Sequence, residues 1–180
     1  LAGGQKDNAI TRECTAQVLT NASAEVKAYA KELQAQIREE YAGTDENISI
    51  EVTEEGTVCT QVLHPTSQEK VLFYLQNVPF GVQKMSGTIP GLVETSTNIG
   101  ILRLDEDELF ASSSVRSSVD TACSALSDKI EYLTEFLGGE YEVQGAYPAW
   151  EYRKESPLRD KMVDIFEEMY GHKPEVVAIH

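Results

Sequence analysis

The sequence has no cluster of basic residues and no long apolar run, and each shortage excludes a class of protein. Its 180 residues contain 15 lysines and arginines against 30 aspartates and glutamates, which gives a formal net charge of −15 at pH 7. Binding to nucleic acid or to an anionic membrane requires clustered positive charge, so neither is expected as a partner. No stretch reaches the roughly 18 apolar residues of a membrane-spanning helix, and no secretory signal is recognisable near the start.

Cysteine is also scarce. Cys14, Cys59 and Cys123 are odd in number and lie far apart in the sequence. This pattern is typical of reduced thiols in a cytoplasmic protein, and it excludes a disulfide framework or a CxxC metal site.

The common motifs of self-contained active sites are missing as well. His64, His172 and His180 are scattered, and none has the spacing of a zinc motif. The sequence contains no GxSxG, Walker or Rossmann pattern. The acidic run 105–108 lacks the ligand spacing of a calcium loop and is interpreted as a solvated turn. We therefore predict no self-contained active site within this chain.

The periodicity of apolar residues predicts an α+β fold, with helices packed on one face of a mostly antiparallel sheet. Asn21 or Ser23, Ser118 and Ser156 are the expected helix caps. The last segment differs, because a helix followed by an apolar run predicts a strand buried on both faces, as in an α/β domain. The elements expected are helices over 23–41, 67–78, 118–137 and 157–170, strands over 14–18, 48–52, 141–143 and 176–179, a hairpin over 99–115, and an irregular stretch over 80–96.

One basic residue stands out for its position. Arg116 ends a predicted strand two residues before the expected helix cap, which brings a guanidinium close to the N–H groups of a helix start. Both groups attract anions, and the planar guanidinium suits a carboxylate. The alternative is that Arg116 pairs with one of the many acidic residues on the surface.

Five segments of the sequence together resemble a known family, in its order and spacing. They are AGGQKDNAITRE at 2–13, TSTNIG at 95–100, SVRSSVD at 114–120, GAYPAWE at 145–151 and VAIH at 177–180. These segments resemble the aminoacyl-histidine dipeptidases, also called Xaa-His or cytosol nonspecific dipeptidases, of the zinc-dependent exopeptidase superfamily. The resemblance extends over essentially the whole chain.

The resemblance implies that the chain is a fragment of a hydrolase. Residues 1–146 would be most of a lid or dimerisation-type domain without its first strand and helix, and 147–180 a hinge and return into the α/β catalytic domain. The parent enzyme would hydrolyse dipeptides, including Xaa-His, with zinc bound outside this segment, so the fragment alone would be inactive. Its partners would be the dipeptide, the remainder of the catalytic domain and, as a candidate, a second copy.

Two residues match substrate-binding positions of the family. By this resemblance Arg116 would bind the carboxylate of the dipeptide, and Asn8 would hydrogen-bond its backbone or the developing oxyanion. Thr11 stands where the family has proline, Pro148 and Trp150 resemble hinge packing, and Asn98 and His180 occupy family segments without an evident role. The rival hypothesis is a stand-alone α+β binding, regulatory or dimerisation module without catalytic activity.

Overall fold

A computed structural model describes residues 1–56 and 61–179, which leaves Cys59 and His180 outside the described residues. The chain forms two compact units. The first unit combines residues 1–16 with 65–180, and the second comprises residues 17–64. Each is described by itself.

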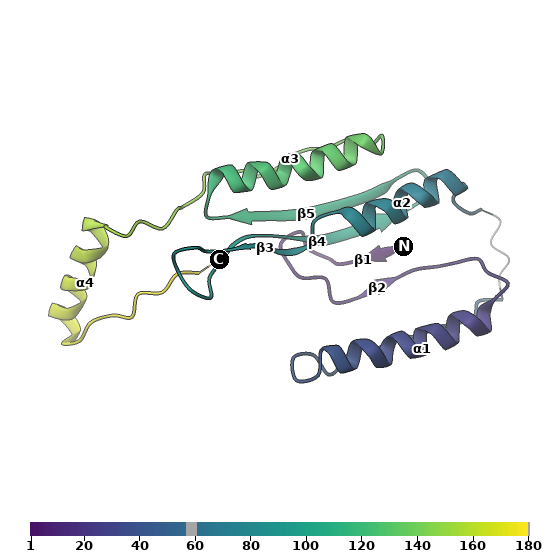
Figure 1. Cartoon of the computed structure of the whole chain (residues 1–180), viewed down its shortest axis with the longest axis horizontal. Coiled ribbons are helices and arrows are strands. Elements are labelled where there is room, and N and C mark those ends of the chain that lie inside the picture. The colour runs from purple at the N-terminus through teal and green to yellow at the C-terminus, as the bar shows by residue number, and fades with distance from the viewer. Residues whose placement is uncertain (57–60, 180) are drawn as a thin grey trace. The chain divides into compact units, whose positions relative to one another are not determined.

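The first unit is built on an antiparallel sheet whose central strand is β4 (Figure 1). One edge of β4 pairs with β5 over most of its length, and the other edge pairs with β3 and, further along, with β1. Every strand pair within the described residues is antiparallel. The strands are β1 (Ala2–Gly3), β2 (Cys14–Thr15), β3 (Gly81–Met85), β4 (Val93–Leu104) and β5 (Leu109–Ser117).

The β4–β5 hairpin confirms the predicted strand pair and extends it at both ends. Its turn is the acidic run, as expected. One carboxylate oxygen of Asp105 accepts hydrogen bonds from the backbone N–H groups of Asp107 and Glu108, both at 3.0 Å. These two bonds hold the pKa of Asp105 below its ordinary value of 3.8, because they favour the ionised carboxylate.

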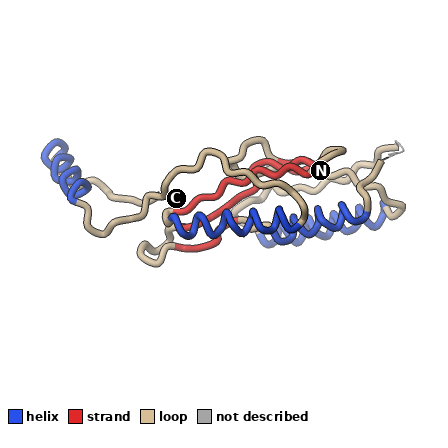
Figure 2. The backbone as a smooth tube through the Cα atoms, turned by 90° about the horizontal axis from the view of Figure 1, so that it is seen from above, coloured by secondary structure: helices blue, strands red, loops and turns tan. Residues whose placement is uncertain are grey.

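Helices α2 (Pro65–Asn77) and α3 (Asp120–Phe136) complete the core of this unit. Helix α3 packs against β5 and buries Leu126 and Ile130, and it lies in front of the strands in Figure 2. The ammonium of Lys70 in α2 donates to the carbonyl of Leu137 just after α3, at 2.6 Å. Helices beside an antiparallel sheet confirm the predicted α+β class. No helix in the described part of the chain is long and apolar enough to cross a membrane.

The ends of the helices show where local capping signals decide the structure. Helix α4 (Pro157–Tyr170) begins as predicted, because the Ser156 hydroxyl accepts from the backbone N–H of Arg159, and it ends at Gly171 with a φ of 74°. The cap predicted at Ser118 is wrong. The N-cap of α3 is Val119, whose N–H is bonded to the Ser117 hydroxyl instead.

Strand β3 lies inside the stretch expected to be irregular. Four of its five residues are exposed, and its register with β4 shifts twice, so no apolar alternation marks it in the sequence. The strands predicted over 141–143 and 176–179 are absent from the described residues. Val177 and Ile179 are 68% and 90% exposed, which contradicts their predicted burial, because nothing in the described part of the chain covers them.

The second unit consists of helix α1 (Ser23–Glu40) and an extended segment beside it. Ala22 is the N-cap of α1, without a side-chain bond, so the caps predicted at Asn21 or Ser23 are wrong. The strand predicted over 48–52 is also wrong. Its backbone bonds to side chains of α1 rather than to another strand, with Gln34 accepting from the N–H of Ile50 at 2.7 Å.

Acid should weaken the hairpin turn. A pKa lowered in the folded state stabilises the fold above the unfolded pKa, and this stabilisation disappears as the pH falls through the lower folded pKa. We expect Asp105→Ala to lower the free energy of unfolding at pH 7, with the difference from the wild type shrinking below about pH 4. Denaturant unfolding at several pH values measures it. Glu106→Ala, in the same turn, is the control, and an Asp105 effect independent of pH would contradict the assignment.

Candidate functional site

Arg116 is the next-to-last residue of β5, on the face of the sheet turned away from α3. It pairs with Ser96 of β4, whereas the neighbouring positions Thr95 and Thr97 are 3% and 1% exposed and belong to the covered face. Because side chains alternate along a strand, Arg116 lies on the opposite face. We call this the distal face; at this end of the hairpin it carries Ser96, Asn98, Ser114 and Arg116.

The guanidinium of Arg116 is free to bind a ligand. The residue is exposed, and within residues 1–56 and 61–179 its side chain makes no ion pair or hydrogen bond. The surface ion pair considered as the alternative is therefore absent from the described residues. Strand alternation places the Arg116 side chain on the face opposite Ser117, and the expected joint anion site with the helix start stays a prediction.

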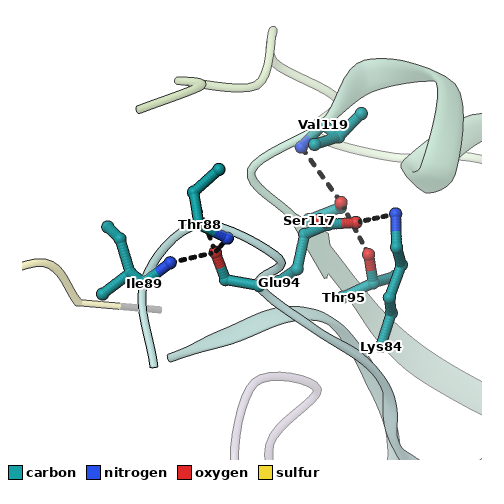
Figure 3. Close-up of polar contacts among 8 residues, drawn as sticks. Lys84, Thr88, Ile89, Glu94, Thr95, Ser117 and Val119 are labelled. Carbon is teal, nitrogen blue, oxygen red and sulfur yellow. Dashed lines mark hydrogen bonds and ion pairs between the residues drawn. The ribbon is translucent and has the colours of Figure 1, made fainter. Parts of the chain in front are cut away.

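A hydrogen-bond network fixes the chain immediately after Arg116 (Figure 3). The hydroxyls of Ser117 and Thr95 bond to each other at 2.9 Å, and the Ser117 hydroxyl also accepts from the N–H of Val119 at 3.1 Å. The largely buried carboxylate of Glu94 pairs with the ammonium of Lys84 at 2.7 Å. These bonds tie β3, β4, β5 and the start of α3 together, so the backbone that carries Arg116 is rigidly held.

Asn8 belongs to residues 4–13, which connect β1 to β2 and which we call the N-terminal loop. β3 pairs with residues 93–97 of β4 and β1 with residues 102–103, which leaves a gap in the ladder. The N-terminal loop fills this gap. The Asn98 side-chain amide donates to the carbonyls of Ala9 and Asp7, at 2.9 and 3.4 Å, and the Thr11 hydroxyl donates to the carbonyl of Ile99 at 2.7 Å.

Two glycines permit this close approach. A Cβ added to Gly100 would stand 2.2 Å from the carbonyl oxygen of Lys6 and 2.3 Å from that of Asp7. A Cβ added to Gly4, which has a φ of 74°, would stand 2.0 Å from the carbonyl oxygen of Gly100. Any side chain at these positions would therefore push the N-terminal loop away from β4.

The structure brings the two predicted site residues to the same region of the first unit. Asn98 lies on the distal face, two residues or about 7 Å along β4 from the partner of Arg116. Its amide holds the carbonyls on either side of Asn8. Asn8 is exposed, and in the described part of the chain its side chain has no hydrogen-bond partner. Two uncommitted polar groups, one a cation and one an amide, therefore belong to segments that are held by neighbouring positions of β4, Ser96 and Asn98.

Sequence reasoning missed what supports this arrangement. Asn98 was placed in a family segment without a role, and the structure gives it one as an anchor of the N-terminal loop. Thr11 differs from the family's proline and uses its hydroxyl as a second anchor, which proline could not provide. Trp150, expected to pack at a hinge, is 90% exposed in the described part of the chain, so its hinge packing stays a prediction.

The described residues do not fit a zinc ion. They contain no group of three or more histidine, cysteine, aspartate or glutamate side chains placed to bind a metal. Cys14 is exposed and Cys123 half-buried, and both are free thiols.

Comparisons with known proteins find dipeptidases that are similar to this chain. No family model matches the chain. The cytosol non-specific dipeptidase of Escherichia coli (strain K12) is 24% identical over 180 residues. The crystal structure of an aminoacylhistidine dipeptidase from Vibrio alginolyticus superposes with a TM-score of 0.86 and is 29% identical.

The chain resembles a dipeptidase over nearly its whole length. Each match covers 99% of this chain but only 37% of the relative, so the chain spans little more than a third of either protein. The resemblance inferred from the five sequence segments is confirmed. As expected, the chain resembles only a part of each larger enzyme.

The glycine contact makes a prediction about stability. Gly100→Ala should lower the free energy of unfolding by about 1–3 kcal/mol, because the new methyl group collides with backbone that cannot rotate away. Thermal or denaturant unfolding measures this. Gly87→Ala is the matched control, since nothing lies within 4 Å of a Cβ there. Equal effects of the two substitutions would contradict the close approach.

Proposed function

We propose that this chain is the lid-domain part of a zinc-dependent dipeptidase of the cytoplasm. Residues 1–146 form most of the lid, and residues 147–180 lead through a hinge into the catalytic domain. The similarity to two dipeptidases over 99% of the chain supports the enzyme class. The observation that carries the role of the chain is the pair of free side chains, Arg116 and Asn8, held near one face of a rigid sheet.

In this proposal Arg116 binds the C-terminal carboxylate of the dipeptide. A guanidinium can donate two parallel hydrogen bonds to a carboxylate, because its planar fork matches the geometry of the two carboxylate oxygens. A fixed Arg116 requires that carboxylate at a set distance from the bond to be cleaved, so it also limits the length of the substrate. The protein has a net charge of −15, so Arg116 provides a local positive charge on a predominantly acidic chain.

Asn8 is proposed to donate its side-chain amide to the substrate, either to the backbone of the dipeptide or to the oxyanion that forms on the attacked carbonyl. A neutral amide donor suits both tasks, and a donor held in place before the reaction stabilises developing charge without reorganisation. The close packing of the N-terminal loop at Gly4 and Gly100 supplies that fixed position.

The metal belongs to other parts of the enzyme in this proposal. The described residues of the chain offer no metal site, and the two proposed contacts of Arg116 and Asn8 do not depend on one. The chain alone is therefore expected to be inactive towards dipeptides, including Xaa-His, and to act only together with the remainder of the catalytic domain. A homodimer is a further candidate assembly.

A stand-alone α+β binding module remains the rival. It predicts a folded protein that binds a small anion without any catalytic domain. The coding sequence on either side of this segment distinguishes the two hypotheses, because the dipeptidase hypothesis requires a metal-binding HxD-type motif upstream. A reading frame without such a motif on either side would favour the rival.

Arg116→Ala should reduce kcat/KM for dipeptides by about 10²-fold or more in the full-length enzyme, because the substrate carboxylate loses a charge-assisted contact. Arg116→Lys keeps the charge and should recover part of the activity. Steady-state kinetics with an Xaa-His dipeptide measures both variants.

The matched control for Arg116 is Arg103→Ala, which removes an arginine of β4 whose guanidinium is already placed 4.8 Å from the centre of the Phe110 ring. It should leave kcat/KM close to that of the wild type. An Arg116→Ala enzyme within about threefold of the wild type would contradict the proposed carboxylate contact.

Asn8→Ala should lower kcat/KM by at least about tenfold, as the loss of one hydrogen bond to the reacting substrate would. A fall in kcat indicates a contact to the oxyanion, whereas a rise in KM indicates a contact to the substrate backbone. Asn77→Ala serves as the control, since among the described residues the Asn77 amide bonds within α2, to the carbonyl of Phe73. Unchanged kinetics of Asn8→Ala would remove Asn8 from the site.

A further inference from the structure

The geometry points to Asn98 as a positioning residue that sets the place of Asn8; this inference rests on the function proposed above. Asn98 does not reach the substrate in this proposal. It acts through the backbone of the N-terminal loop.

The hydrogen bonds of Asn98 reach the residues on both sides of Asn8. The Nδ2 atom donates to the carbonyl oxygen of Ala9 at 2.9 Å and to that of Asp7 at 3.4 Å, so its two acceptors are the residues immediately before and after Asn8. Both acceptors are carbonyl oxygens, and only the nitrogen end of the amide can serve them. A single side chain therefore holds the Asp7–Asn8 peptide group and the Ala9–Ile10 peptide group, which lie on either side of Asn8 along the loop.

The other anchors of the N-terminal loop act at a distance from Asn8. Thr11, three residues after Asn8, donates its hydroxyl to the carbonyl of Ile99. Gly4, four residues before Asn8, contacts Gly100. These contacts hold the loop against β4. The Asn98 bonds are the side-chain contacts, among the described residues, made to the carbonyls that flank Asn8.

Asn98 also connects the N-terminal loop to the β4–β5 ladder that carries Arg116. It pairs with Ser114 in β5, and two residues away on the same face Ser96 pairs with Arg116. The backbone of both pairs belongs to one ladder, so the distance between the Arg116 and Asn98 backbones is fixed by sheet geometry. The amide of Asn98 holds the otherwise irregular N-terminal loop at a fixed position relative to this ladder. Arg116 and Asn8 can then be held at a constant separation.

The test uses Asn98→Ala and Asn98→Asp in the full-length enzyme, with Ser114→Ala as control. Asp keeps the size of Asn but replaces the donor by an oxygen that repels both carbonyls. If Asn98 acted by packing alone, Asn98→Asp would therefore behave like the wild type. Ser114 shares the strand pair and the face with Asn98, and its side chain makes no hydrogen bond in the described part of the chain.

Amide hydrogen exchange over residues 5–11 is the readout that does not depend on activity. We expect exchange to become at least about fivefold faster there in both Asn98 variants, because the loop opens more often, and to be unchanged in the β4–β5 hairpin and in Ser114→Ala. Unchanged exchange in residues 5–11 would overturn the inference, whatever the activity.

The kinetic readout is a double-mutant cycle. Asn98→Ala alone should lower kcat/KM by about five- to tenfold, with the same division between kcat and KM as Asn8→Ala. In an Asn8→Ala background its further effect should fall to about twofold or less, whereas in an Arg116→Ala background the full effect should persist. Full additivity with Asn8→Ala would overturn the inference.

The two proposals fail in different ways. Faster loop exchange in the Asn98 variants, with Asn8→Ala as active as the wild type, would contradict the function proposed for Asn8 and leave the loop contact of Asn98 established. Slow exchange in the variants, with Asn8→Ala strongly impaired, would keep Asn8 in the site and remove Asn98 as its positioning residue.

Discussion

The first unit depends on the contact between the N-terminal loop and the gap in the β4 ladder. Sheet edges carry unpaired N–H and C=O groups that need partners. Here two short strands occupy the ends of the edge, and between them the Thr11 hydroxyl of the N-terminal loop donates to the carbonyl of Ile99, while the Asn98 amide of β4 donates to carbonyls of the loop. The backbones approach so closely that only glycine fits at positions 4 and 100. A loop that would otherwise be free thereby acquires the order of a strand.

This contact explains why the candidate site combines a regular and an irregular element. Arg116 takes its position from a long ladder and from the Ser117 network after it, both of which are ordinary sheet chemistry. Asn8 lies in a loop that the Asn98 bonds fix to the sheet. A loop held in this way can present a side chain outside the strand ladder and still keep it in place, which favours binding of a small, extended ligand.

The parts of the fold that sequence reasoning predicted are those decided by neighbouring residues. Helix α4 has its serine cap, its proline and its terminal glycine within the segment itself, and the acidic turn at Asp105 closes on its own carboxylate. The conformations of strand β3 and of the segment 48–52 depend on the elements beside them. The residues of these two segments do not reveal those neighbours. The apolar run at 176–179 shows the same limit, since its alternation is absent and it forms no strand in the described part of the chain.

The candidate site follows the same division. Arg116 and Asn8 could be selected from short segments, whereas the roles of Asn98, Thr11 and Gly100 depend on pairs of residues about 90 positions apart. That separation has a consequence for how the candidate site assembles. The hairpin closes through a turn of four residues, while the N-terminal loop must find a surface that exists only after the hairpin has formed. We expect the Arg116 side of the face to be complete early in folding and the Asn8 side to be the last to assemble and the first to be lost.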